Sequence, residues 1–153
     1  MIRASVSHQR WVYYAASVWA LCFAAPHIWW AFGSPFGFPG GQANHRLWMT
    51  TWWRYLYDVI VCLLSILGAV VALALRPPGH ARLRRVFRAL AWMAAGLLTL
   101  RGVAGLIADG TSDPIWWPTF LVGGILFGGV AWLSRTRTLT TVAFDIGTND
   151  GKP

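Results

Sequence analysis

Three residues that could do chemistry lie inside otherwise apolar stretches of this chain: His27, Asp58 and Arg101. Arg101 is the one formal charge between Ala89 and Ile107. A charge at the centre of a membrane helix costs about 2.5 to 3.5 kcal/mol on insertion scales, so it needs a partner, water or an escape to the interface. An imidazole can exchange a proton, and a carboxylate can pair with a guanidinium. The three residues therefore predict either a polar ligand pocket or a structural ion-pair cluster.

The composition of the 153-residue chain indicates an integral membrane protein. Hydrophobic residues make up 56% and charged residues only 12%, whereas soluble domains carry about 25% charged residues. Most of the eleven tryptophans lie near the ends of apolar runs, where indole rings are enriched in membrane proteins. The net charge of +8 comes from short basic segments between these runs. Without a nucleic-acid recognition pattern, it favours a lipid bilayer and no nucleic acid as partner.

Four apolar runs are each about as long as a hydrocarbon core is thick. They predict helices over residues 11–32, 55–75, 86–107 and 115–133. We therefore expect an all-α integral membrane four-helix bundle, forming a single domain over residues 1–135. The first run continues through Pro26 to Trp30, which favours a retained helix over a signal peptide. The polar, threonine-rich segment 136–153 is expected to be a mobile cytoplasmic tail.

The distribution of basic residues predicts the orientation of the bundle. One side has only Arg46 and Arg54 in its loops, and the other side carries most of the arginines and the lysine: Arg3, Arg10, Arg76, Arg82, Arg84, Arg85, Arg88, Arg135, Arg137 and Lys152. By the positive-inside rule, both termini are cytoplasmic and the protein lies in the inner membrane. Twelve arginines against one lysine, with abundant alanine, indicate a GC-rich bacterial source.

The loop over residues 33–54 is rich in glycine, proline and aromatic residues. This composition predicts an ordered cap that lies at the outer membrane interface. We expect an outer belt of interfacial aromatics on and around this cap, made of Trp29, Trp30, Trp52, Trp53, Trp116 and Trp117.

With this topology, the three ionisable residues share the outer third of the bilayer. A rise of about 1.5 Å per residue puts His27, Asp58 and Arg101 about 8, 5 and 9 Å below the outer helix ends. Each lies on a helix face of mostly small residues at three-four spacing, the type of face through which membrane helices pack. We expect Arg101 to pair with Asp58, with His27 nearby and Asp109 as the competing partner.

Two further features concern helix shape and packing. Pro26 leaves the Cys22 carbonyl without its helical donor, which predicts either a tolerated kink or a hinge beside His27. Gly124 and Gly128 form a small-xxx-small pattern that predicts close packing of the fourth helix.

The chain offers no pattern typical of a metal or catalytic site. His27 is an unfavoured ligand for a metal or haem because His8, His45 and His80 fall at or outside the predicted membrane boundaries. The two cysteines, 22 and 62, lie in apolar runs and behave as small hydrophobic residues. No cofactor is assigned.

The segment Pro26 to Gly33, its glycine- and aromatic-rich loop, and the later triplet Leu100-Arg101-Gly102 resemble a family of small bacterial membrane proteins, domain of unknown function 3995. The resemblance covers roughly residues 11–135. It implies four membrane helices, and it supplies neither an activity nor catalytic residues.

These observations leave three functions open. The chain contains no glutamate, nucleophile–base pair, phosphate loop or metal motif, which favours a non-enzymatic accessory subunit or a bundle that binds a lipid or small ligand. The second function is a small transporter or channel subunit, which would need a homo-oligomer or a partner membrane subunit because four helices are few. The third is a membrane enzyme acting on a lipid or quinone, with His27 as general acid or base.

Overall fold

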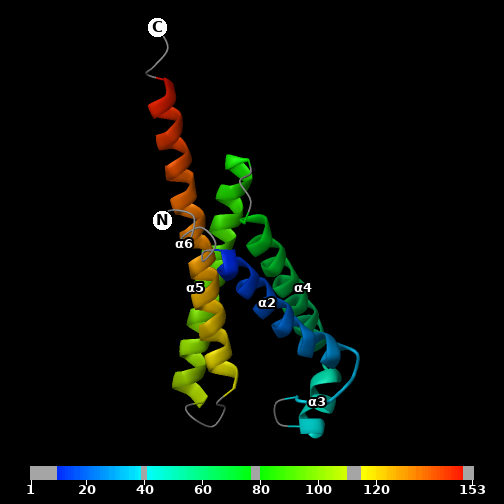
Figure 1. Ribbon diagram of the computed structural model, residues 1–153. Helices are drawn as coiled ribbons and strands as arrows, with labels where there is room; N and C mark the ends of the chain where they lie inside the picture. The colour runs from blue at the N-terminus through cyan, green and yellow to red at the C-terminus, as the bar shows by residue number, and fades with distance from the viewer. Residues whose placement is uncertain (1–9, 39–40, 77–79, 110–114, 150–153) are drawn as a thin grey trace. The chain divides into compact units, whose positions relative to one another are not determined.

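The computed structural model describes residues 10–38, 41–76, 80–109 and 115–149, without the side chains of residues 41, 48, 109 and 136–149. All regular structure in these ranges is helical, which confirms the predicted all-α class (Figure 1). The helices are α2 (Arg10–Ala31), α3 (Gly41–Met49), α4 (Trp52–Ala74), α5 (Ala81–Asp109) and α6 (Trp116–Asn149). Arg3 and Lys152 lie outside the described residues, as do the side chains of Asp109 and Arg137.

Three helical segments in the described part of the chain are long and apolar enough to cross a membrane. They are Trp52–Ala74, Ala81–Ala108 and Trp116–Arg135, and they support a membrane protein. Helix α2 is 22 residues long but is not among the three, because its tryptophans and tyrosines, with Pro26 and His27, lower its hydropathy. A fourth span therefore stays a prediction.

Two helices are longer than the apolar runs that predicted them. Helix α5 begins at Ala81 and includes the arginines that follow it. Arginine is a good helix former, and its guanidinium can stay in water while its backbone is helical. Helix α6 continues to Asn149, where we expected a polar tail from residue 136. The segment 136–149 has no proline, and polar residues alone do not end a helix.

The chain divides into two compact units, and the single domain expected over residues 1–135 stays a prediction. We call Ser17–Val70 the cap unit, and Met1–Ala16 with Val71–Pro153 the paired-helix unit. The cap unit contains most of α2 and α4 and all of α3. The paired-helix unit contains α5 and α6 together with one end of α2 and of α4.

In the cap unit, α2 and α4 are antiparallel and pack against one another through a face of small residues. The Ser17 hydroxyl donates to the Ala69 carbonyl at 3.1 Å, and His27 lies beside Asp58 further along. Ala20 and Ala24 are buried between these two contacts. The three-four spacing of small residues thus predicted the buried face of α2.

In the paired-helix unit, α5 and α6 pack along one another. A Cβ atom on Gly124 would collide with the Thr99 hydroxyl and lie 3.2 Å from the Ala95 carbonyl oxygen. A Cβ atom on Gly102 would lie 2.7 Å from the Leu121 side chain. Gly124 therefore permits the close helix approach that its sequence pattern predicted.

Candidate functional site

The candidate site lies at one end of the cap unit, where α2 turns into the following loop. Gly33 has a φ of 88°, a left-handed conformation that suits glycine. Its N–H donates to the Trp30 carbonyl at 2.9 Å, and the Ser34 N–H donates to the Trp29 carbonyl at 3.2 Å. This pair of bonds is a Schellman motif, which ends α2 and reverses the chain so that the loop can cover the end of the helix.

Trp30 fixes the loop against α2. Its Nε1–H donates to the Phe36 carbonyl at 3.0 Å. The Phe38 ring lies edge-on to Trp30, with ring centroids 5.1 Å apart. Trp30 is only 4% exposed, so its side chain packs inside the protein, and its position at the membrane interface stays a prediction. The helical phase contained this information, because Phe23, His27 and Trp30 recur at i, i+4 and i+7.

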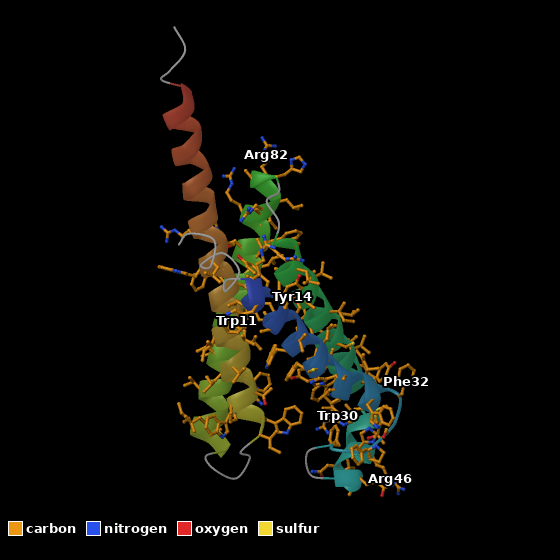
Figure 2. The ribbon with its side chains drawn as sticks, in the orientation of Figure 1. Trp11, Tyr14, Trp30, Phe32, Arg46 and Arg82 are labelled. Carbon is orange, nitrogen blue, oxygen red and sulfur yellow. The ribbon has the colours of Figure 1, made fainter. Side chains whose placement is uncertain are left out.

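The other predicted interfacial tryptophans are more accessible. Trp29, Trp52 and Trp53 are 57%, 76% and 52% exposed, while Trp116 and Trp117 are half-buried. Figure 2 shows Phe32 and Arg46 beside Trp30 at this end of the cap unit. The cap unit thus carries exposed aromatic rings on α2 and α4 in addition to the buried Trp30.

Helix α3 contributes His45, which sequence analysis placed outside the membrane and left without a role. His45 is 4% exposed, and its Nε2 lies 3.3 Å from the Trp30 carbonyl oxygen. Because a carbonyl only accepts, this nitrogen carries the hydrogen. His45 thus satisfies a carbonyl in the last turn of α2. No signal in the sequence indicated this contact, because it depends on the turn at Gly33 that brings α3 to the end of α2.

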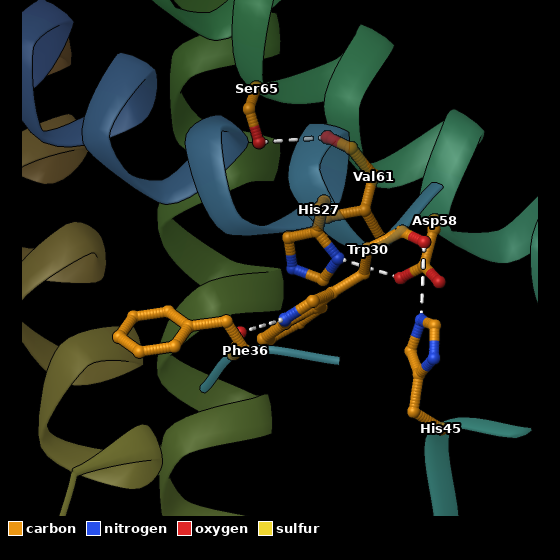
Figure 3. A network of polar contacts seen from close by, with 7 residues as sticks. All are labelled: His27, Trp30, Phe36, His45, Asp58, Val61 and Ser65. Atoms are coloured by element: carbon orange, nitrogen blue, oxygen red, sulfur yellow. Dashed lines mark hydrogen bonds and ion pairs between the residues drawn. The ribbon is translucent and has the colours of Figure 1, made fainter. Parts of the chain in front are cut away.

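The centre of the site is a buried pair between α2 and α4. His27 Nδ1 lies 2.8 Å from Asp58 Oδ1, as Figure 3 shows. The residues are 6% and 1% exposed, respectively. The structure therefore brings together two of the three predicted site residues, in a hydrogen-bonded pair that satisfies the carboxylate.

Aromatic rings surround His27. Its ring centroid lies 5.2 Å from Phe23, 5.1 Å from Trp30 and 6.5 Å from Tyr57. Its second nitrogen, Nε2, is buried and has no hydrogen-bond partner in the structure. A buried polar atom left unpaired costs about 1 to 3 kcal/mol. The site therefore holds one oriented and unsatisfied polar atom within an aromatic shell.

Arg101 belongs to the paired-helix unit, and its pairing with Asp58 stays a prediction. Its guanidinium carbon lies 5.1 Å from the centre of the Phe120 ring, within the range of a cation–π contact. Its Nη1 lies 3.3 Å from the position a Cβ atom on Gly105 would take. The side chain therefore extends one turn toward the C-terminal end of α5, in the manner of a snorkelling arginine.

The geometry limits the chemistry that the site can perform. Within the described ranges, no three His, Cys, Asp or Glu side chains are grouped to hold a metal ion. The hydroxyls of Ser17 and Ser65 donate to backbone carbonyls, and His27 Nε2 has no partner. Helix α2 continues across Pro26, whose proposed hinge role is a separate prediction. The oriented imidazole can accept a hydrogen bond or a proton.

Comparison with known protein families, curated proteins and solved structures finds no match to this chain. The resemblance to domain of unknown function 3995 therefore stays a prediction, and the functional argument depends on the geometry of the site.

Proposed function

We propose that this chain is a non-enzymatic multi-pass membrane protein whose cap unit binds a small amphiphile carrying a hydroxyl group, of the lipid or quinol class. The observation that carries the proposal is the buried Nε2 of His27, which has no hydrogen-bond partner among the described residues. A ligand hydroxyl would supply the missing partner. The three membrane-spanning candidates support a ligand that is itself dissolved in the bilayer.

The His27–Asp58 pair favours a donor ligand. With Asp58 ionised, the hydrogen of a neutral His27 ring lies on Nδ1, so Nε2 presents a lone pair. Since the pair then carries one negative charge, a neutral hydroxyl is a better ligand for it than an anion.

The same proposal includes a topology. In it, four helices cross the inner membrane of a bacterium, both termini are cytoplasmic, and the cap unit lies at the outer interface. The exposed rings of Trp29, Trp52, Trp53 and Phe32 support this placement, since aromatic residues favour the interface. The site would then be open to amphiphiles that enter from the outer leaflet.

A second candidate function is general base catalysis on a lipid or quinone. The Asp58–His27 pair favours it because the carboxylate orients the imidazole, as in a catalytic dyad. It is the weaker candidate, since no hydroxyl or thiol of the described residues is hydrogen-bonded to Nε2, so the dyad lacks a nucleophile among them.

Native mass spectrometry in mild detergent tests the proposal. The purified protein is titrated with a short-chain quinol and with the matching quinone, which lacks hydroxyl donors. We expect the quinol to bind roughly tenfold more tightly, about the worth of one hydrogen bond to a buried group. The variant His27→Phe removes the acceptor and should lose this preference, whereas His80→Phe, at an exposed histidine, should keep it.

Equal binding of both compounds, or an unchanged preference in His27→Phe, would contradict the proposal. Turnover of the quinol or of an added lipid that disappears in His27→Phe would favour the catalytic alternative.

A further inference from the structure

The paired-helix unit carries an unbalanced cluster of arginines near the start of α5. Four of them lie in its first two turns: Arg82, Arg84, Arg85 and Arg88. The sequence contains no acidic residue between Asp58 and Asp109, so none lies on α5 before its last residue. This positive charge therefore has no acidic counterpart on α5 before Asp109, at the opposite end of the helix.

The helical spacing places these arginines beside one another. Arg82 and Arg85 are three residues apart, as are Arg85 and Arg88, so their side chains share neighbouring positions on the helix surface. Like charges at such spacings destabilise a helix. Figure 2 shows the Arg82 side chain near the beginning of α5. The arrangement lowers the stability of the free helix and favours a bound anion.

Arg84 is already positioned by the protein. Its Nη2 donates to the Ser134 carbonyl of α6 at 3.3 Å. Its Nε is buried and has no hydrogen-bond partner in the structure. Arg84 thus adds a second observation to the charge cluster, because a tethered guanidinium retains a donor that is unsatisfied.

The surroundings indicate an amphiphilic anion. The side chains of Leu83 and Val86, which lie between the arginines, are exposed, and a membrane-spanning candidate begins at Ala81. Arginine forks match the geometry of phosphate oxygens, and the first N–H groups of a helix favour an anion. A headgroup phosphate would meet the arginines while its acyl chains cover the neighbouring apolar side chains.

We propose that the first two turns of α5 bind the phosphodiester headgroup of an anionic phospholipid. The proposal requires that α5 is embedded in a membrane, and it does not depend on a ligand at His27. Basic residues next to a membrane helix attract anionic lipids, with each residue increasing the affinity roughly fivefold.

Lipid titrations followed by native mass spectrometry test the site. The probes are phosphatidylglycerol and phosphatidylcholine with identical acyl chains. We expect tighter binding of phosphatidylglycerol, and a loss of roughly 100-fold in the triple variant Arg82→Gln/Arg85→Gln/Arg88→Gln, from three basic residues at about fivefold each. Arg84 is left in place to keep its bond to Ser134.

Three controls make the result specific. The matching triple lysine variant keeps the charge and should retain most of the affinity, which separates charge from folding. Arg46→Gln removes an exposed arginine of α3 in the cap unit and should have no effect. In His27→Phe, where a glycerol hydroxyl no longer has the imidazole acceptor in the cap unit, the preference for phosphatidylglycerol should persist and should still be lost on adding the three glutamine replacements, so the two proposals fail independently.

Equal affinity for the two lipids would overturn the inference, as would full affinity in the glutamine variant. Loss in the lysine variant as large as in the glutamine variant would also overturn it. Displacement of phosphatidylglycerol by excess inorganic phosphate would identify a free phosphate site in place of a lipid site.

Discussion

Each of the two units is stabilised internally by a different kind of contact. In the cap unit, polar side chains cross between elements, as in the His27–Asp58 pair and the Trp30–Phe36 hydrogen bond. In the paired-helix unit, α5 and α6 approach closely at glycines such as Gly124. The cap unit is therefore sensitive to the loss of a polar partner, and the paired-helix unit is sensitive to added side-chain volume.

The largest effect is expected at the buried His27–Asp58 pair. Replacing Asp58 by alanine leaves His27 buried without the partner that its Nδ1 requires. Breaking a buried pair in this way costs about 3 kcal/mol or more. The measurement is the free energy of unfolding in mixed micelles, followed by helical circular dichroism.

A double replacement sharpens this test. The variant Asp58→Leu/His27→Leu removes both polar groups, so it should recover most of the lost stability. Asn44→Ala, at an exposed position of α3, is the control and should change little. A double variant as unstable as Asp58→Ala would show that an unpaired His27 is not the cause of the lost stability.

The second effect tests the opposite vulnerability, in the paired-helix unit. Gly124→Val introduces a Cβ atom where the Thr99 side chain and the Ala95 carbonyl already lie. Overpacking of this kind costs about 2 kcal/mol. Gly96→Ala is the matched control on α5, because a Cβ atom there meets nothing within 4 Å, and its stability should be equal or slightly higher. Similar losses in both variants would contradict close packing at Gly124.

A smaller effect is expected at Trp30. The variant Trp30→Phe keeps a buried ring and removes the hydrogen bond to the Phe36 carbonyl, at a cost of about 1 kcal/mol. Hydrogen exchange measured by mass spectrometry should show faster exchange in residues 33–38. Trp29→Phe, on the exposed neighbour, should leave that exchange unchanged. Equal exchange rates in the two variants would contradict a stabilising role of Trp30 in the loop.

The smallest effect is expected at the far end of the cap unit. Ser17→Ala removes the hydroxyl that donates to the Ala69 carbonyl. Hydrogen bonds between membrane helices contribute about 0.6 kcal/mol on average, and the unfolding free energy should fall by that amount. Ser134→Ala is a useful comparison, because the Ser134 hydroxyl donates to Ala131 within its own helix. If Ser17→Ala lowered the unfolding free energy as much as Asp58→Ala, the expected difference in strength between these two contacts would be wrong.

Helical periodicity explains what the sequence could predict. The buried face of α2 and the close approach at Gly124 both follow from residues three or four apart on one helix. His27 and Asp58 could be placed near one another because each lies near the predicted outer end of its helix. These properties depend on local spacing, which the amino-acid sequence contains directly.

The remaining features depend on tertiary structure. His45 reaches the Trp30 carbonyl only because the turn at Gly33 folds the loop back over α2, and residue spacing does not give the direction of that turn. Trp29 and Trp30 are adjacent tryptophans that helical phase separates, but the contacts of the buried ring with Phe36 and Phe38 depend on how the loop folds back. The extension of α6 was missed because a polar segment can be either helix or coil.

The length of α6 has a mechanical consequence. Its 34 residues correspond to about 51 Å at 1.5 Å per residue, whereas a hydrocarbon core is about 30 Å thick. If Trp116–Arg135 crosses the membrane, the remaining turns extend about 20 Å beyond it. The helix then acts as a lever arm, which turns any tilt of its embedded half into a displacement of its far end.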